Sequence, residues 1–564
     1  MKRLTKIIRS ISTPMYEELP FVINSVLLSG GFMSFWHRVV KNANTFTNFF
    51  FDICWLSVIF LLLACITVNA VKRKSLVRGL LYLIPLILVI VNVWLRLSLG
   101  TDISTNILMV IMETNGSEIS GFLNSFLFTK ETAITCGILI LLVLYIMFTE
   151  YFYRKIKPNN RIVYIISACY TITAIIGCLC SVNYYVSLFK SESLDDAVAI
   201  EDEVCHTDIS LKKLLFSGFN LYLSSKEIPT IINVTEEILK SDDIECYEQD
   251  SLDVILVVGE SYIKWHSGLY GYYLNTTPRM EEERKRGNLL VYNKVSTPSN
   301  LTSIVLKNVL SCNNFEKGEK WYEYPYFLSF FKKAGYRVDY WDNQFAWNKE
   351  KAFVFALNSL LYDRRIVKMS YNEINERCFD YDSDFVEDYF KQTVHKKHNF
   401  VFLHLMGQHV GFSDRYPQGY NYFSADSISR KDSWITAEMK KEIAAYDNAT
   451  RYNDYVIGKI IDRYKNSNAV IIYFSDHGEE VYDYRPSMGR DMGDVMTNEL
   501  RKYQYEIPFV VWFSDKFKRN YPDKISALKK NVNKAFDISN VYNTLFSLGC
   551  IKTSRYDLKE DLTK

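Results

Sequence analysis

The stretch AVIIYFSDHGEE, residues 469–480, runs from an unbroken apolar segment into an Asp–His pair and two further acidic residues. Neighbouring side chains on a strand point to opposite faces of the sheet, so Asp476 and His477 can converge only where the strand has ended and the chain turns. Open α/β sheets build their binding sites at such strand ends. The pair is therefore a candidate for metal binding at the end of a buried strand.

Further apolar runs of strand length occupy residues 253–259, 336–342, 399–407 and 507–514. Amphipathic segments lie between them, among them Tyr326–Lys333, which Pro325 could open, and Ala437–Lys465. Apolar runs that alternate with amphipathic helices are typical of a mainly parallel sheet covered by helices on both faces. We therefore predict an α/β domain over residues 251–564.

Two other predicted strands also end in residues that bind divalent cations. Glu260 follows Gly259 at the end of the first strand, and the strand that starts near residue 399 leads into His404 and His409. Carboxylate oxygens and imidazole nitrogens are ligands that Zn²⁺ accepts. Each motif alone is more often solvated surface or a helix cap. Their coincidence at three strand ends favours a metal site.

The apolar residues concentrate before residue 190, and four stretches approach the ~20 residues that cross a bilayer. They are Phe49–Val71, Val77–Leu99, Ala133–Tyr153 and Ile162–Phe189. A weaker stretch, Leu19–Trp36, is diluted by Gly, Ser and Asn. Counting it as a span puts the basic N-terminus and the basic loops at 72–74 and 154–161 on one side, as expected for the cytoplasm. We predict a five-span domain over residues 1–190.

The other segments follow from this topology. Residues 101–128 mix polar and apolar positions and are predicted to lie as amphipathic helices on the outer membrane surface, although a solvated loop fits the pattern equally well. Residues 191–250 are predicted to form a linker with short helices. The α/β domain would then lie outside the cytoplasm, which in a bacterium is the periplasm.

Charge and cysteine content limit the partners. The formal net charge of the 564 residues is +2, which gives no reason to expect nucleic-acid binding, and we expect a monomer. The cysteines beyond the spans are an odd, scattered set that does not predict a disulfide framework, and their pairing is left open. They are Cys205, Cys246, Cys312, Cys378 and Cys550.

The motifs GESYIKWHSGLYGYYLNTTPR (259–279), LHLMGQH (403–409) and SDHGEE (475–480) resemble, in order and spacing, those of the phosphoethanolamine transferases of bacterial inner membranes. That family belongs to the alkaline phosphatase and sulfatase superfamily. SDHGEEVYD (475–483) and YEIPFVVWFSDKF (505–517) make the resemblance closest to the branch that modifies core heptose. It implies transfer of phosphoethanolamine from phosphatidylethanolamine to lipopolysaccharide, at core heptose or lipid A, through a covalent threonine intermediate.

Position by position, the resemblance implies a nucleophile in the segment TSIVLKNVLS (302–311), and Thr302 takes its place ahead of the nearby hydroxyls of Thr297 and Ser303. Metal coordination lowers the pKa of a hydroxyl and makes it nucleophilic. Without the resemblance, Thr302 reads as an ordinary helix N-cap. The implied ligands of one Zn²⁺ are Glu260, Thr302, Asp476 and His477, with a second zinc left open.

The resemblance also implies contacts to the transferred group. His409 matches a histidine that contacts the phosphoryl group or a second metal, and Asn343 and Gln344 match a polar pair near the substrate pocket. Lys264 and His266 lie near the strand-end glutamate and could meet substrate phosphate, although a surface role fits them equally.

One departure bears on the second zinc. Lipid A-modifying members carry a further histidine after the Asp–His pair, whereas RPSMGRDMGD (485–494) has none here, so Arg485 or Arg490 could hold phosphate instead. Two other functions remain as alternatives: a glycerol-phosphate transferase of the lipoteichoic acid synthase type, and an inactive sensor that retains the fold. A sulfatase activity is disfavoured because Cys312 lacks the Pro and Arg spacing needed for conversion to formylglycine.

Overall fold

The computed structural model describes residues 13–31, 43–70, 74–99, 101–113, 127–156, 160–191, 209–345, 357–490 and 496–564. The chain divides into two compact units. The first comprises Met1–Ile111 and Phe126–Ser224, and the second comprises Met112–Ser125 and Ser225–Lys564.

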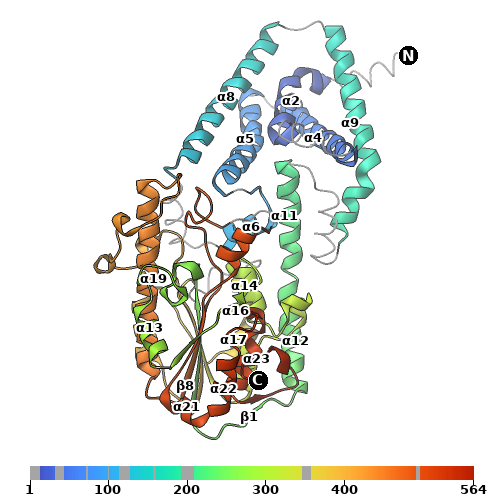
Figure 1. The fold of residues 1–564 in the computed structure, drawn as a ribbon. Coiled ribbons are helices and arrows are strands. Elements are labelled where there is room, and N and C mark those ends of the chain that lie inside the picture. The colour runs from blue at the N-terminus through green and yellow to red at the C-terminus, as the bar shows by residue number, and fades with distance from the viewer. Residues whose placement is uncertain are drawn as a thin grey trace. The chain divides into compact units, whose positions relative to one another are not determined.

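The first unit is helical (Figure 1). Its principal helices are α2 (Leu19–Val26), α4 (Ala43–Ala70), α5 (Lys74–Leu99), α8 (Lys130–Ile156), α9 (Asn160–Phe189) and α11 (Ser210–Ser224). Four windows are long and apolar enough to cross a membrane, and they match the four clear stretches of the sequence. They are Phe49–Thr67, Lys74–Leu99, Lys130–Ile156 and Arg161–Asn183.

The weak fifth stretch, Leu19–Trp36, holds the shorter apolar helix Leu19–Ser29, and its residues 32–36 lie outside the described part of the chain. The fifth span therefore stays a prediction. Within the predicted amphipathic segment, residues Thr105–Glu113 form helix α6, while residues 114–126 are outside the described ranges.

Ion pairs tie the helices of the first unit together. Arg78 Nη1 of α5 lies 2.8 Å from Glu18 Oε2, and Lys212 Nζ of α11 lies 2.8 Å from Asp52 Oδ1 of α4. A charge removed from water is costly unless it is paired, so each pair fixes which helices can pack together.

The second unit is built on a seven-stranded sheet in the order β3-β9-β8-β2-β7-β5-β6. Its strands are β2 (Leu252–Gly259), β3 (Leu289–Val291), β5 (Arg337–Asp342), β6 (Glu373–Ile374), β7 (His398–His404), β8 (Ala469–Ser475) and β9 (Phe509–Phe513). Strand β9 runs antiparallel to both β8 and β3, and the other pairings are parallel. The predicted mainly parallel sheet is confirmed.

Successive residues of β2 enter different cores. Leu256 packs in one apolar cluster, with helices that include α12 (Glu227–Ser241), α14 (Thr302–Val309), α15 (Leu328–Lys333), α22 (Pro522–Lys530) and α23 (Val541–Leu548). Val257 packs in the other, with α13 (Pro278–Lys285), α18 (Asp382–Gln392) and α19 (Ala437–Tyr464). Figure 1 shows α13 and α19 on one side of the sheet and α14 and α23 on the other. Helices therefore cover both faces, as the apolar strand pattern predicts.

The remaining elements complete the second unit. Two small sheets pair β1 (Glu245–Cys246) with β11 (Ile551–Lys552) and β4 (Val295–Ser296) with β10 (Phe536–Asp537). Short helices are α16 (Leu357–Leu361), α17 (Arg364–Ser370), α20 (Asn498–Leu500), the π-helix η9 (Arg501–Tyr505) and α21 (Asp515–Asn520). Of the cysteines beyond the spans, the structure describes four, all free: Cys246, Cys312, Cys378 and Cys550; Cys205 lies outside the described ranges.

Candidate metal centre

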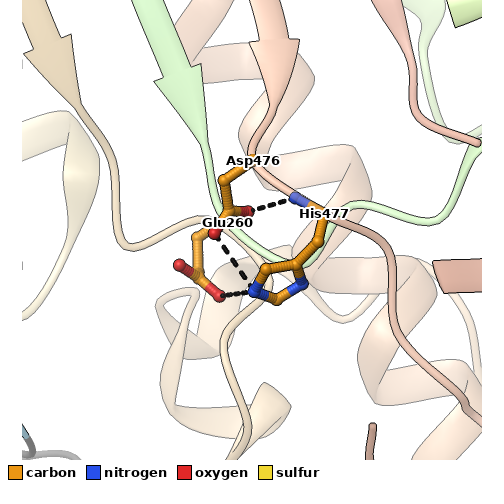
Figure 2. A group of neighbouring side chains, drawn as sticks. All are labelled: Glu260, Asp476 and His477. Carbon is orange, nitrogen blue, oxygen red and sulfur yellow. Dashed lines mark hydrogen bonds and ion pairs between the residues drawn. The ribbon is translucent and has the colours of Figure 1, made fainter. Parts of the chain in front are cut away.

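Two carboxylates and an imidazole meet beyond the ends of strands β2 and β8. Glu260, Asp476 and His477 are fully buried, and each offers a ligand atom within 4.8 Å of the other two (Figure 2). His477 Nε2 lies 3.1 Å from Asp476 Oδ2 and 3.4 Å from Glu260 Oε1. The strand-end residues singled out in the sequence thus share one site.

Strand pairing places the two carboxylates side by side. Strands β2 and β8 are parallel neighbours, with Gly259 opposite Ser475, so Glu260 and Asp476 each follow the last paired residue of their strand. A Cβ at Gly259 would lie 2.4 Å from the Tyr473 hydroxyl, so this position accepts only glycine without rearrangement. Ser261 then turns the chain with φ 56°, a left-handed conformation that is uncommon outside glycine.

Hydrogen bonds orient both carboxylates. The Glu260 oxygens accept from Ser261 Oγ at 2.7 Å and from Gln344 Nε2 at 2.9 Å. Asp476 Oδ1 accepts from the backbone N–H groups of Ser261 and His477 at 3.1 and 2.7 Å. Asp476 Oδ2 is buried without a hydrogen-bond partner among the described residues. A buried carboxylate oxygen left without a donor fits a metal ligand.

The tautomer of His477 suits metal binding. Its Nδ1 lies 2.7 Å from the Gly478 carbonyl oxygen, so the ring proton sits on Nδ1 and the Nε2 lone pair faces the two carboxylates. Arg490 Nη1 donates to the same Nε2 at 2.9 Å. Burial, followed by the charge of Arg490, lowers the pKa of His477 to about 3, which keeps the imidazole neutral, the form that binds metals.

Thr302 joins this group. Its Oγ1 donates to Glu260 Oε2 at 3.2 Å and lies 3.2 Å from His477 Nε2. Thr302 is the first residue of α14, whose N-cap is Leu301, and no side chain caps this helix. The alternative that Thr302 is an N-cap is therefore wrong, and all four predicted ligands lie together.

The two carboxylates have opposite protonation tendencies. Burial raises the pKa of Asp476 well above its ordinary value, and the nearby Glu260 charge raises it further. Burial also opposes ionisation of Glu260, but its interactions with His477 and His409 and the positive charge of Arg490 outweigh burial and hold the Glu260 pKa below its ordinary value. Two buried carboxylates this close cannot both ionise without a compensating cation. The donor set of two carboxylates, one neutral imidazole and one hydroxyl fits a divalent metal of the zinc type.

The predicted substrate contacts divide into two groups. Gln344 donates to Glu260 and thus lies at the candidate metal centre, and His409 is close enough to Glu260 to influence its pKa. Burial, followed by the charges of Arg415 and Arg490, lowers the pKa of His409 itself to about 4. The Asn343 side chain is instead bonded within the fold, because its Nδ2 donates to Asp382 at 2.9 Å and its Oδ1 accepts from the backbone of Phe379.

Lys264 and His266 are also engaged by other protein groups. Lys264 Nζ donates to the carbonyl oxygen of Asn293 at 2.7 Å and pairs with Glu506 at 3.2 Å. His266 lies between Asp447, at 2.7 Å from Nδ1, and Asp483, at 3.2 Å from Nε2. Both side chains are buried, so the surface alternative is wrong, and their contact with substrate phosphate stays a prediction.

Two residues support the candidate metal centre without a specific role in the sequence-based prediction. Ser261 bonds both carboxylates, yet no sequence pattern signals that a serine will adopt a left-handed turn. His404, which the sequence offers only as a strand-end histidine, contacts Gln344 through Nε2 at 3.1 Å and lies 3.1 Å from Asp342 through Nδ1. It therefore supports the Gln344 side chain that holds Glu260.

Comparison with known proteins places the fold in a family. The Sulfatase family model matches residues 253–549, more than half of the chain. The chain belongs to the sulfatase family. The matched residues begin within β2 and end after α23, so the whole sulfatase-family domain, including the metal centre, is covered.

Among curated proteins, phosphoethanolamine transferase EptC from Escherichia coli K12 is 25% identical over 473 residues, covering 81% of this chain and 77% of EptC. The crystal structure of the periplasmic domain of EcEptC matches with a TM-score of 0.50 at 25% identity, covering 57% of this chain and 89% of that domain. The integral membrane lipooligosaccharide phosphoethanolamine transferase A from Neisseria meningitidis matches 98% of this chain and 97% of its own, with a TM-score of 0.59 at 17% identity. The predicted fold, a helical apolar region followed by a sulfatase-like domain, is confirmed.

Gly407 offers a test of how Glu260 is held. It has φ +50°, and a Cβ there would lie 2.8 Å from both the backbone nitrogen and the carbonyl oxygen of Glu260. Gly407→Ala should therefore lower the free energy of unfolding by about 1–3 kcal/mol and reduce the bound metal per chain. Gly419→Ala is the control, because nothing lies within 4 Å of its Cβ. Equal melting temperatures and metal contents for the two variants would contradict this view of Gly407.

His266 predicts a pH dependence of stability. Burial lowers its pKa, but Asp483 and Asp447 outweigh burial and raise it to about 10, above the ordinary 6.5. Its contribution to stability should be complete below pH 6.5 and decline as pH rises through about 10. His266→Gln should cost about 3–5 kcal/mol near neutral pH, because the buried Asp447 loses its charged partner and keeps only the Tyr272 hydroxyl, while Asp483 retains Arg430. Melting curves should be recorded for both proteins from pH 6 to 10.5. The difference in melting temperature between His266→Gln and the unsubstituted protein should become smaller at the alkaline end, and a constant difference would argue against a charged His266.

Proposed function

We propose that this sulfatase-family chain is a zinc-dependent phosphoethanolamine transferase of the bacterial inner membrane, with its second unit in the periplasm. The observation that carries the proposal is the position of the Thr302 hydroxyl, 3.2 Å from both Glu260 and His477. A relative matched over most of both chains is named a phosphoethanolamine transferase. Four helices that are long and apolar enough to cross a membrane suit an enzyme that takes a lipid donor.

The ion would be held by four side chains: Glu260, Thr302, Asp476 and His477. A bound Zn²⁺ would supply positive charge that lowers the pKa of the Thr302 hydroxyl and stabilises charge on the phosphoryl group. Glu260 Oε2 already accepts a hydrogen bond from Thr302 Oγ1 and is therefore placed to take up its proton. Thr302 begins α14, whose first backbone N–H groups favour a phosphate group at this position.

The reaction would proceed in two half-reactions. Thr302 Oγ1 attacks the phosphorus of phosphatidylethanolamine, the bond to the diacylglycerol oxygen breaks, and diacylglycerol leaves with a proton. A hydroxyl or phosphate oxygen of lipopolysaccharide, on core heptose or lipid A, then attacks the phosphoethanolamine on Thr302, and the threonine hydroxyl re-forms. Arg490, whose guanidinium lies 2.9 Å from His477 Nε2, would meet phosphoryl oxygens where other family members have a second-zinc histidine.

The alternatives make different predictions about donor and activity. A glycerol-phosphate transferase would use phosphatidylglycerol in place of phosphatidylethanolamine. An inactive sensor would need only the fold, whereas Glu260, Asp476 and His477 lie together here and the Thr302 hydroxyl lies 3.2 Å from both Glu260 and His477, which supports an enzyme. Transfer assays with both lipids separate these functions.

Thr302→Ala tests the nucleophile. The variant should lose transfer from phosphatidylethanolamine by at least about a thousandfold, because removing a nucleophile removes the covalent route. Thr302→Ser keeps the hydroxyl and should retain measurable activity. Mass analysis of lipopolysaccharide from expressing cells gives the readout, and melting temperature checks the fold. Unchanged modification by Thr302→Ala would remove Thr302 from its role, and transfer from phosphatidylglycerol alone would favour the alternative enzyme.

Metal removal tests the cofactor. Treating the purified full chain with a strong chelator should abolish transfer, and added Zn²⁺ should restore it where Mg²⁺ does not. The melting temperature should fall as well, because Glu260 and Asp476 would lose a shared counter-charge and a ligand that binds only the folded state stabilises it. Full activity and an unchanged melting temperature after chelation would rule out a zinc-dependent mechanism.

A further inference from the structure

The metal centre draws its residues from loops far apart in the sequence. Thr302 and His477 are 175 positions apart, and their side chains meet at 3.2 Å. They come from two segments. We call residues 295–302, which run from strand β4 to the first residue of α14, the nucleophile loop, and residues 476–480, which follow β8, the metal loop. Something must hold the two loops in register, because displacing a reacting group by about 1 Å can cost a hundredfold in rate.

A third segment, residues 500–507, touches both loops, and we call it the bridging segment. It contains the π-helix η9, Arg501–Tyr505, a helix form that is rare and often found at functional sites. The Gly478 N–H of the metal loop donates to the carbonyl oxygen of Gln504 at 2.9 Å. A Cβ at Gly478 would lie 1.9 Å from the Tyr503 carbonyl oxygen, so the two backbones are in direct contact.

The same segment is bonded to the nucleophile loop. The Thr297 N–H donates to the Tyr505 carbonyl oxygen at 3.0 Å, and the Ile507 N–H donates to the Val295 carbonyl oxygen at 3.2 Å. These bonds reach the beginning of the nucleophile loop. Nearer to Thr302, the contact is made by a side chain.

That side chain belongs to Gln504. Its Oε1 accepts from Asn300 Nδ2 at 2.8 Å, two residues before Thr302, while its own carbonyl oxygen accepts from Gly478, the residue after His477. Gln504 is fully buried, and its Nε2 donates to the Tyr484 hydroxyl at 3.2 Å. One residue therefore links a position two residues before Thr302 with the residue that follows His477.

We propose that Gln504 is a positioning residue that keeps the Thr302 hydroxyl within reach of the metal held by Glu260 and His477. Gln504 is not one of the four proposed metal ligands, and it acts through Asn300. The role in transfer rests on the proposed function, whereas the role in placing Thr302 as a metal ligand does not. A buried hydrogen bond that loses one partner leaves the other unsatisfied, which makes the Asn300–Gln504 bond sensitive to either side chain.

Gln504→Met and Asn300→Ala remove this bond from opposite ends, and the Gly478 bond survives because it uses the Gln504 backbone. Each variant should weaken Zn²⁺ affinity, measured by chelator competition, by about tenfold, as is usual when a partner of a metal ligand is lost. The kcat for transfer should fall about a hundredfold with KM little changed. The variant that combines Gln504→Met with Asn300→Ala should lose no more Zn²⁺ affinity or kcat than either single variant, because both substitutions remove the same bond. Tyr484→Phe, which removes the hydroxyl to which Gln504 Nε2 donates and leaves the Asn300 bond in place, is the matched control and should leave both quantities unchanged.

The deciding comparison is a double-mutant cycle in metal affinity with Thr302→Ala. If Gln504 acts through Thr302, Gln504→Met should not weaken Zn²⁺ binding further in the Thr302→Ala background. An equal loss in both backgrounds would overturn the proposal, and so would a Gln504→Met or Asn300→Ala variant with unchanged affinity. Because the cycle needs no transfer assay, a chain that transfers nothing but shows the coupling would refute the proposed function and leave the positioning role standing. If Gln504→Met does not fold, the Asn300→Ala cycle decides the matter.

Discussion

The parallel pairing of β2 with β8 is the constraint on which the rest of the site depends. Its register puts Gly259 opposite Ser475, and the next residues of the two strands, Glu260 and Asp476, emerge as buried neighbours. Two carboxylates in such a place repel each other unless a positive charge lies between them. The neutral His477 and the Thr302 hydroxyl complete a set of donors around the same point. The sheet thus brings together two buried carboxylates whose negative charge a divalent cation would balance.

Some side chains bond the candidate ligands directly, and others support those side chains from further away. Ser261 and Gln344 bond Glu260 directly, and His404 supports Gln344 from behind. The bridging segment reaches the site through the backbones of the metal loop and the nucleophile loop and through Asn300. Such layering is expected of metal centres, in which groups beyond the ligands set ligand orientation and basicity.

Much of this was accessible from the sequence, because apolar runs identify buried strands and the residues just past them identify the ligands. The strand runs at 253–259 and 469–476 and the ligand pair Asp476–His477 are examples. What the sequence could not indicate depended on tertiary contacts. Lys264 and His266 are close to Glu260 along the chain, yet the turn at Ser261 directs them to Glu506 and to two aspartates. The antiparallel direction of β9 likewise leaves no trace in an apolar run.

The bond that orients His477 has a consequence for how the site can change over evolutionary time. In many metal centres a ligating histidine is fixed by a carboxylate side chain, which one substitution can remove. Here the anchor is the carbonyl oxygen of the adjoining Gly478. Every amino acid carries that oxygen, but any side chain at Gly478 would collide with the Tyr503 carbonyl oxygen, so the bond depends on glycine through the path of the main chain. The orientation of the His477 imidazole is therefore set by the backbone conformation of the turn, and it can change during evolution only if that backbone conformation changes.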